Sequence, residues 1–419
     1  MKNLVGACVF GQSGGPSAVI NSSASGVFTE ALKQKNITAV YGAAHGIKGV
    51  LDENFYDISQ ESTEELWLLR NTPSSALGSV RYKLKDPKVD DSDYKRILEV
   101  FKKYNIRYFF YNGGNDSMDT CNKISKYLLA SGYDCNIIGV PKTIDNDLYG
   151  TDHCPGYGSA AKYVATTIME LNLDATVYNV GQVTVIEIMG RNAGWLTAAA
   201  ALASAVGGCG ADLIYLPEVP FDLDKFIDDV KLATANNNGK CIVAVSEGIK
   251  DKSGAYISEV LAAASANKDN FGHTQLGGLA ASLAALVKEK IGCKVRPIEF
   301  SLMQRCAAHL ASAVDVEEAF QAGQLAVRAA CEGETDKMVV FDRQLISGVY
   351  KCVLGLMDVA LAANTEKKVP KDWITANGAG LTKEYIEYAL PLIQGESKAP
   401  LENGLPRFAK LAKILVPKK

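Results

Sequence analysis

Residues 136–140 read Asn-Ile-Ile-Gly-Val, and residues 141–147, which follow directly, read Pro-Lys-Thr-Ile-Asp-Asn-Asp. The first run is apolar, which predicts a buried strand of a parallel sheet. The second run brings a lysine, a threonine hydroxyl and three polar acceptors to the end of that strand. Because ligands bind at the carboxyl ends of strands in open α/β sheets, this segment predicts both an α/β fold and the place of a functional site.

The chemistry of residues 141–147 suits the transfer of a phosphoryl group. A carboxylate can accept the proton of an attacking hydroxyl, and a lysine neutralises anionic oxygen. Taken alone, the Asp-Asn-Asp run is as typical of a turn whose side chains cap the segment that follows. The rest of the chain decides between these two interpretations.

Apolar and amphipathic segments alternate along the chain. Strands are expected at residues 5–10, 39–41, 107–111, 136–140, 182–188, 213–216, 242–246 and 338–341. Helices are expected at residues 18–34, 94–104, 116–130, 159–172, 195–205 and 222–234. This alternation predicts two three-layer α/β domains with mostly parallel sheets facing a cleft. We place the domains at residues 1–150 and 151–305, followed by a helix-rich C-terminal region, residues 306–419, that packs back on the first domain.

Composition excludes several classes of protein. The chain of 419 residues is 47% hydrophobic and 22% charged with a net charge of −3, which argues against a nucleic-acid partner. Its ten cysteines form no C-x-x-C pair, as expected for reduced thiols in a cytoplasmic protein. Its four histidines have no ligand-like spacing, and its longest apolar stretch, residues 198–206, is too short to cross a membrane. No secretory signal is expected at the N-terminus.

Two further strands are followed by glycine-rich loops. Residues 11–17 read Gly-Gln-Ser-Gly-Gly-Pro-Ser, and residues 112–117 read Asn-Gly-Gly-Asn-Asp-Ser. Such loops let backbone amides and a helix N-terminus approach an anion. Neither loop fits the P-loop or dinucleotide-binding patterns, and each taken alone is also typical of a tight turn or an N-cap. With residues 141–147 they place three polar loops at one sheet edge, where the Asn115 oxygen and nearby carboxylates suit Mg²⁺.

The second half of the chain carries residues that suit a sugar phosphate. Met189-Gly190-Arg191 and Glu247-Gly248 each follow an expected strand, and Arg296 and Arg305 flank residues 297–304. Arginine binds phosphate in a forked geometry, and a carboxylate suits sugar hydroxyls. Each residue taken singly is equally typical of a surface ion pair.

In combination and in this order, six motifs resemble the 6-phosphofructokinase family over residues 1–320, and most closely its pyrophosphate-dependent branch. They are Gly-Gly-Pro-Ser at 14–17, Gly-Gly-Asn-Asp-Ser at 113–117, Pro-Lys-Thr-Ile-Asp-Asn-Asp at 141–147, Met-Gly-Arg at 189–191, Glu-Gly at 247–248 and Gln-Arg at 304–305. Asp116 and Lys142 stand where ATP-using members carry glycine. A carboxylate at 116 repels the α-phosphate and blocks the nucleoside of ATP, and the lysine adds charge for pyrophosphate.

The resemblance implies reversible, Mg²⁺-dependent transfer from pyrophosphate to the C1 hydroxyl of fructose 6-phosphate, in a homodimer or homotetramer. It makes Asp145 the base, with Lys142 and Asp116 as the other catalytic residues. It implies that pyrophosphate binds Gly14, Gly15, Arg81 and Lys142, and that Asn115 is the metal ligand. It implies that the sugar phosphate binds Thr143, Ile144, Asp145, Met189, Gly190, Arg191, Glu247, Arg296, Leu302 and Arg305, with Arg296 reaching the site of a neighbouring subunit.

Three residues depart from the family pattern. Asn115 stands where aspartate is common, Gln182 where many ATP-using members have arginine, and Leu302 where histidine or tyrosine often contacts the sugar phosphate. A pyrophosphate-dependent sedoheptulose 7-phosphate kinase is therefore an alternative. The others are an ATP-dependent phosphofructokinase, against which Asp116 and Lys142 argue, another Gly-Gly-Asp kinase acting on NAD or diacylglycerol, and a regulatory paralogue that binds sugar phosphate without turnover.

Overall fold

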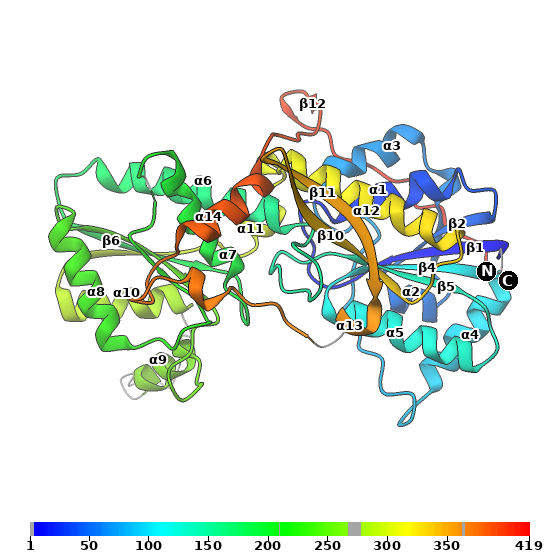
Figure 1. The fold of residues 1–419 in the computed structure, drawn as a ribbon, viewed down its shortest axis with the longest axis horizontal. Helices are drawn as coiled ribbons and strands as arrows, with labels where there is room; N and C mark the ends of the chain where they lie inside the picture. Colours follow the sequence, from blue (N-terminus) through cyan, green and yellow to red (C-terminus); the bar gives the residue numbers. More distant parts are fainter. Residues whose placement is uncertain (1–3, 209, 267–277, 363–364) are drawn as a thin grey trace.

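The strand expected at residues 136–140 is β5 (Asn136–Pro141), which lies inside a seven-stranded sheet in this computed structural model (Figure 1). The structure describes residues 4–208, 210–266, 278–362 and 365–419. The sheet has the order β11-β10-β5-β4-β1-β2-β3. Its other strands are β1 (Gly6–Gln12), β2 (Ile37–Ala43), β3 (Phe55–Asp57), β4 (Ile106–Gly113), β10 (Lys337–Ile346) and β11 (Val349–Asp358).

The register of the central strands brings the three polar loops together. Strands β1, β2, β4, β5 and β10 run parallel, and the two antiparallel strands, β3 and β11, form the edges. Gln12 at the end of β1 pairs with Asn112, and Gly113 at the end of β4 pairs with Pro141. Because β1, β4 and β5 end level, the loops that follow them lie side by side.

Helices cover both faces of this sheet. Helices α1 (Ile20–Ala31) and α12 (Ala313–Cys331) pack on one face, and α4 (Ser92–Tyr104) and α5 (Asn115–Ala130) on the other. The two helices of the first pair cross closely, since a Cβ on Gly26 would lie 2.0 Å from the Phe320 carbonyl oxygen. Shorter helices on this unit are α2 (Ile47–Leu51), α3 (Thr63–Leu68) and α13 (Val359–Ala362).

A second sheet, of order β7-β8-β6-β9, forms the other unit. All its strands run parallel: β6 (Gln182–Ile188), β7 (Leu213–Tyr215), β8 (Lys240–Ser246) and β9 (Lys294–Glu299). Ile188 pairs with Ser246, so the loops beginning at Met189 and Glu247 are neighbours. The helices of this unit are α6 (Tyr157–Thr176), α7 (Trp195–Ala198), α8 (Leu223–Asn236), α9 (Ile257–Ala266), α10 (Leu279–Ile291) and α11 (Met303–Cys306).

The layers follow the same plan as in the first unit. Helices α8 and α10 cover one face of the second sheet, and α6, α7 and the 3₁₀ helix Ala199–Val206 cover the other. The predicted fold of two three-layer α/β units is therefore confirmed. The helix expected at residues 195–205 is in fact one α-helical turn that continues as a 3₁₀ helix.

The C-terminal region contains more strand than expected. The strand predicted at residues 338–341 is β10, which continues to Ile346 and forms an antiparallel hairpin with β11. Further along, Val369, Tyr385 and Leu392 join the core of the second unit, in part through α14 (Lys383–Ala389). The last residues return to the first unit, where the short strands β12 (Leu401–Glu402) and β13 (Leu405–Pro406) precede the tail.

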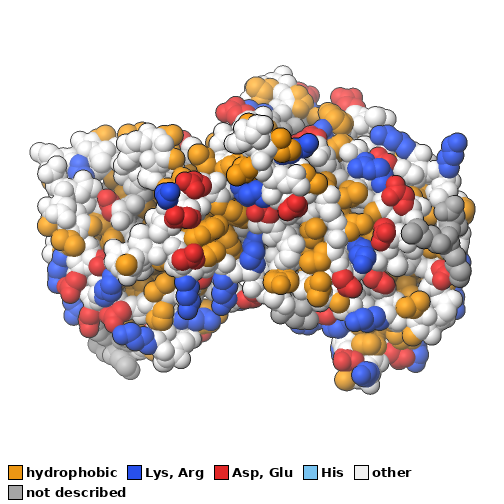
Figure 2. All heavy atoms as spheres, in the orientation of Figure 1, with side chains coloured by type: hydrophobic (Ala, Val, Ile, Leu, Met, Phe, Trp, Pro, Cys, Tyr) orange, Lys and Arg blue, Asp and Glu red, His pale blue; other side chains and the backbone are white. Residues whose placement is uncertain are grey.

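The surface does not separate charges of opposite sign on the face seen in Figure 2, where the two units appear as two lobes and Lys, Arg, Asp and Glu are interspersed. Among the helices of the described residues, none combines the length and the apolar character that a membrane crossing requires.

Candidate active site

A cleft of about 910 Å³ lies between the two units, at the carboxyl ends of both sheets. Its lining includes five cationic and five acidic side chains, so opposite charges meet over a short distance. Thirteen of the predicted site residues line this cleft: Gly14, Gly15, Arg81, Asn115, Asp116, Lys142, Thr143, Ile144, Asp145, Met189, Arg191, Glu247 and Arg305.

Lys142 links the loop after β5 to the loop after β1. Its backbone nitrogen donates to the Gly113 carbonyl at 3.0 Å, and its Nζ donates to the Gly15 carbonyl at 2.5 Å. The side chain is buried, and this burial lowers the pKa of Lys142 to about 8. The nearby carboxylates of Asp145 and Asp147 oppose that shift. The ammonium is thus fixed beside the glycine loop and carries its charge at neutral pH.

The two acidic residues of the motif are held apart by Asn146, which has a left-handed backbone with φ of 54°. The Asn146 side chain is fully buried, donates to the Tyr388 hydroxyl at 2.8 Å and accepts from the Cys154 backbone nitrogen at 2.9 Å. These bonds identify Asn146 as the residue that fixes the loop, while Asp145 and Asp147 face the cleft.

Asp145 has the properties of a general base. Burial first, and then the charge of Asp147, raise the pKa of its carboxyl to about 6, against the opposing effect of Lys142. Its backbone nitrogen donates to Thr143 Oγ1 at 3.1 Å, which fixes the start of the turn. A base with a pKa near the working pH combines a deprotonated resting state with a useful affinity for the proton.

The glycine loop after β1 also meets residues from two other segments. The Ser79 hydroxyl donates to the Gly14 carbonyl at 2.6 Å, which anchors the segment that carries Arg81 into the cleft. A Cβ on Gly15 would lie 3.0 Å from Nη1 of Arg305, so the arginine of the second unit reaches this loop. Cations from both units therefore converge on one side of the cleft.

Asp116 occupies the first turn of α5 and is mostly exposed in the cleft. Its carboxylate lies 3.6 Å from Lys83 Nζ, and both side chains are more than two-thirds exposed, so the pair adds little to stability. Its negative charge instead disfavours a ligand that would place an anionic group beside it.

The oxygen of Asn115 is the clearest candidate for a cation ligand. Asn115 Oδ1 is buried and has no hydrogen-bond partner among the described residues, while its Nδ2 donates to Asp147 Oδ2 at 3.4 Å. A buried carbonyl oxygen without a donor costs free energy unless a ligand satisfies it. Burial raises the pKa of Asp147 above its ordinary value, and the charge of Glu366 acts in the same direction, against the opposing effect of Lys367. This oxygen and this carboxylate fit a hard divalent cation.

The second unit contributes a hydrogen-bonded pair of loops. The Met189 nitrogen donates to Gln304 Oε1 at 3.1 Å, and the Ser246 hydroxyl donates to the Gly190 carbonyl at 2.6 Å. Gln304 is buried and thereby fixes Arg305, its neighbour, relative to the Met189 loop. Glu247 follows Ser246 directly and faces the cleft. The motifs at 189–191, 247–248 and 304–305 thus form one bonded surface.

Three predicted residues do not line the cleft. Gly190 lies behind it, where its carbonyl holds Ser246. Arg296 is exposed on β9, the edge strand of the second sheet. Leu302 is 54% exposed and also lies outside the lining. Within one chain these three positions therefore lie outside the residues that line the cleft, and of the three only Arg296 is expected to act across a subunit boundary.

Three charged residues of the cleft had been assigned no site role: Asp147, Lys83 and Glu366. Asp147 was visible in the sequence as the third polar residue of the Asp-Asn-Asp run. Glu366 had no such signal, because no strand end or motif precedes it. It accepts from Asn192 Nδ2 at 2.8 Å and pairs with Leu148 in an isolated bridge, so a C-terminal segment crosses the seam between the two units.

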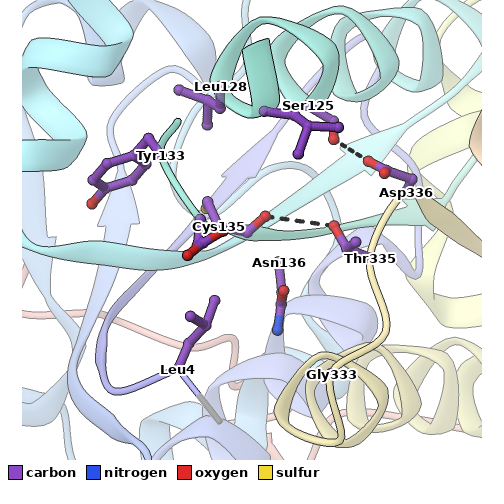
Figure 3. Close-up of a pocket in the computed structure, with 11 residues that line it drawn as sticks. Leu4, Ser125, Leu128, Tyr133, Cys135, Asn136, Gly333, Thr335 and Asp336 are labelled. Carbon is purple, nitrogen blue, oxygen red and sulfur yellow. Dashed lines mark hydrogen bonds between the residues drawn. The ribbon is translucent and has the colours of Figure 1, made fainter. Parts of the chain in front are cut away.

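A smaller cavity of about 120 Å³ lies at the opposite end of β5, beside Asn136 (Figure 3). Ser125 donates to the Asp336 carboxylate there, and Thr335 donates to the Cys135 carbonyl at 3.5 Å. No lysine or arginine occurs among its described lining residues, so it lacks the charges that hold a phosphate.

The fold and the cleft define a class, namely two-unit α/β proteins whose strand-end loops bring carboxylates and cations into one cleft. The phosphofructokinase family model matches residues 8–298, and the chain belongs to the phosphofructokinase family. Arg305 and Glu366 lie beyond the matched range.

Individual relatives match over nearly the whole chain. A pyrophosphate–fructose 6-phosphate 1-phosphotransferase of Halomonas elongata is 43% identical over 413 residues, covering 98% of this chain and 97% of the relative. A protein of the same name from Methylococcus capsulatus is 42% identical over 413 residues, with the same coverage. The crystal structure of a pyrophosphate-dependent phosphofructokinase from Marinobacter aquaeolei has a TM-score of 0.88 at 40% identity, covering 99% of this chain and 98% of that chain.

Proposed function

We propose that this chain transfers a phosphoryl group from pyrophosphate to the C1 hydroxyl of fructose 6-phosphate, giving fructose 1,6-bisphosphate and orthophosphate reversibly. The observation that carries the proposal is the reach of Lys142 from the Asp145 loop to the Gly15 carbonyl at 2.5 Å. It brings a cation, a general base and a glycine loop into one cleft. The names of the relatives that match almost the whole chain support the same activity.

In the proposed mechanism Asp145 accepts the proton of the C1 hydroxyl, and the freed oxygen attacks the nearer phosphorus of pyrophosphate. The bond to the bridging oxygen breaks, and orthophosphate leaves. Lys142, with the backbone amides near Gly14 and Gly15, stabilises charge on the transferring group and on the leaving oxygen. Arg81 adds a further cation on the donor side. The reverse reaction uses the same groups, with Asp145 returning the proton.

Mg²⁺ is the proposed cation, bound by Asn115 Oδ1 and Asp147. The support is the buried, unpartnered oxygen of Asn115 beside a carboxylate whose pKa is raised. When bound, the ion neutralises charge on the pyrophosphate oxygens. The amide oxygen of Asn115 carries less negative charge than a carboxylate at this position would. Asp147 therefore supplies more of the electrostatic attraction for the cation in this chain.

We assign donor selection to Asp116 and Lys142. The exposed carboxylate of Asp116 repels the α-phosphate of ATP and occupies space that the nucleoside requires. The buried ammonium of Lys142 supplies charge to a donor that has no adenosine for additional binding contacts. ATP therefore meets repulsion while pyrophosphate gains attraction, and both effects contribute to specificity.

The sugar phosphate is proposed to bind between the loops of the two units. Arg305 holds the 6-phosphate, Arg191 orients the substrate, and Glu247 accepts from sugar hydroxyls. Thr143, Ile144 and Met189 orient the reacting end, and Gly190 supports the Met189 loop from behind the cleft, where its carbonyl accepts from Ser246. Arg296 is exposed on an edge strand, and we propose that it completes the site of a neighbouring subunit in a homodimer or homotetramer, with Leu302 near the same boundary.

The proposed roles of the two units in binding the donor and the sugar phosphate also assign the domains. Residues 1–150 form the donor domain, residues 151–305 the sugar-phosphate domain, and residues 306–419 connect to both. We propose a cytoplasmic location, because the described cysteines are all free thiols.

The deciding experiment is the formation of fructose 1,6-bisphosphate by the purified chain from fructose 6-phosphate and Mg²⁺, with pyrophosphate and with ATP in parallel. Turnover with pyrophosphate and not with ATP is expected. Turnover with ATP alone would contradict the donor assignment while keeping the family. A third arm with sedoheptulose 7-phosphate tests the sugar, and binding without turnover in every arm would leave a regulatory protein.

A further inference from the structure

A buried polar cluster outside the cleft joins the loop after Asp147 to the C-terminal hairpin. His153 is 3% exposed, with Nδ1 at 2.8 Å from Asp152 Oδ2 and Nε2 at 2.7 Å from Glu318 Oε2. The Cys352 thiol on β11 completes the group, because single ligand atoms of His153, Glu318 and Cys352 all lie within 4.8 Å of one another. Imidazole, carboxylate and thiolate are the ligand types that Zn²⁺ takes in proteins.

The surroundings of His153 match those of a metal-bound histidine. Arg343 holds the Asp152 carboxylate through Nε at 3.0 Å and Nη2 at 3.0 Å, so Asp152 is fixed as the partner of Nδ1. The ring of Phe341 stacks on the imidazole at a centroid distance of 5.0 Å. A carboxylate that accepts from one ring nitrogen sets the tautomer and directs the other nitrogen to a metal.

The charges of the cluster allow Zn²⁺ to enter without leaving net charge in the interior. The carboxylates of Asp152 and Glu318 flank His153, and Arg343, with Nη2 at 3.0 Å from Asp152 Oδ2, balances one of them. Zn²⁺ bound with the Cys352 thiolate adds two positive charges against the remaining carboxylate and the thiolate, so no uncompensated charge is buried.

We propose that His153, Glu318 and Cys352 form a Zn²⁺ site that is separate from the cleft. Cys352 is half-buried, so an ion can enter from the hairpin side. The Tyr350 hydroxyl, which donates to Glu318 Oε1 at 2.8 Å, keeps the carboxylate in place beside the site. Mg²⁺ does not compete, because it prefers oxygen ligands and an octahedral shell.

The site has a structural consequence. His153 lies on the loop that leaves the Asp145–Asp147 motif, Glu318 lies on α12, and Cys352 lies on β11. One ion therefore connects three segments that are far apart in the sequence, and binding to the folded state alone raises its stability.

The test uses the full chain in excess Mg²⁺, which occupies oxygen ligands in the cleft. Co²⁺ is the spectroscopic probe, because a thiolate ligand gives a charge-transfer band that carboxylates do not give. The expected results are such a band, its displacement by Zn²⁺, one Zn²⁺ per chain and a higher melting temperature with Zn²⁺.

Two variants and one control decide the assignment. Cys352→Ser and His153→Gln should each abolish the Co²⁺–thiolate band, whereas Cys306→Ser, which removes an exposed thiol outside the cluster, should leave it unchanged. If His153→Gln does not fold, the result for Cys352→Ser decides the assignment, because Cys352 is only half-buried and its replacement disturbs the interior less. Absence of the band in the unmodified chain, or its survival in Cys352→Ser, would overturn the proposal.

Discussion

Asn146, between the two carboxylates of its motif, donates from Nδ2 to the hydroxyl of Tyr388 at 2.8 Å, across 242 residues of sequence. The Tyr388 hydroxyl donates in turn to the Asp152 carbonyl at 2.7 Å. One phenol on α14 thus closes both ends of the loop that carries Asp145 and Asp147. The geometry of the proposed base depends on a residue outside the range of the family match.

Replacing Tyr388 by phenylalanine is expected to lower both stability and turnover. The buried Asn146 amide and the Asp152 carbonyl lose their partner, which costs about 1–3 kcal/mol of unfolding free energy. We expect kcat to fall about tenfold, since Asp145 is less well oriented, with small changes in KM. Denaturant unfolding and steady-state kinetics measure the two effects.

Tyr133→Phe is the matched control, because the buried hydroxyl of Tyr133 donates to two carbonyls far from the cleft. This variant should lose stability and keep its kcat. Equal kcat values for the two variants would contradict the role of Tyr388.

The double variant Asp116→Gly, Lys142→Gly is expected to exchange donors. Removing the carboxylate relieves the repulsion of ATP, and removing the ammonium weakens pyrophosphate binding. We expect kcat/KM for pyrophosphate to fall by about 100-fold or more, in line with the loss of one preorganised charge, and measurable turnover with ATP to appear.

The control for that variant is Asp224→Gly, which removes a first-turn helix aspartate from α8, outside the cleft. It should leave both donors unaffected. Unchanged exclusion of ATP in the double variant would mean that residues other than 116 and 142 select the donor.

The parts of the site that sequence could predict are those in which one short segment carries both a strand and its loop. Residues 136–147 contain the apolar run, the cation and the base together, and the level ends of β1, β4 and β5 then follow from parallel pairing. Most of the predicted site residues line the cleft for this reason.

The parts that sequence could not predict depend on contacts between distant segments. The residues of β11 are at most half-buried and only some of them are apolar, so the sequence pattern does not predict this strand. The pattern also predicts a β10 that is shorter than the one observed. Glu366 enters the cleft because Lys367 donates from its backbone to the Asp147 carbonyl at 2.8 Å, which no local pattern signals. The exposure of Arg296 likewise reflects the edge position of β9, which is a property of strand order.

The pH dependence of pyrophosphate use should show an alkaline decline caused by Lys142. Burial lowers the pKa of this lysine to about 8, so the side chain is charged below that pH and neutral above it. Because the charged form attracts pyrophosphate, kcat/KM for pyrophosphate should fall about tenfold per pH unit above about pH 8. Lys142→Arg should lose this decline, since a guanidinium does not titrate there, although its absolute activity is lower.

Lys83→Arg provides the matched control, because it changes an exposed cation of the same cleft. Its profile should keep the decline of the unmodified chain. A decline that persists in Lys142→Arg would assign the titration to another group.

Glu366 is expected to position the sugar-phosphate loop through Asn192, whose Nδ2 donates to Glu366 Oε1 at 2.8 Å. Glu366→Ala removes this acceptor beside Arg191. The loss of one exposed hydrogen bond is worth about 1 kcal/mol, so KM for fructose 6-phosphate should rise about three- to tenfold with little change in kcat. Glu366→Gln keeps an acceptor for Asn192 and removes only the charge, so its KM should stay near that of the unmodified chain. If the glutamine variant shows the same rise as the alanine variant, the negative charge of Glu366 acts on the substrate directly, and the positioning role is wrong.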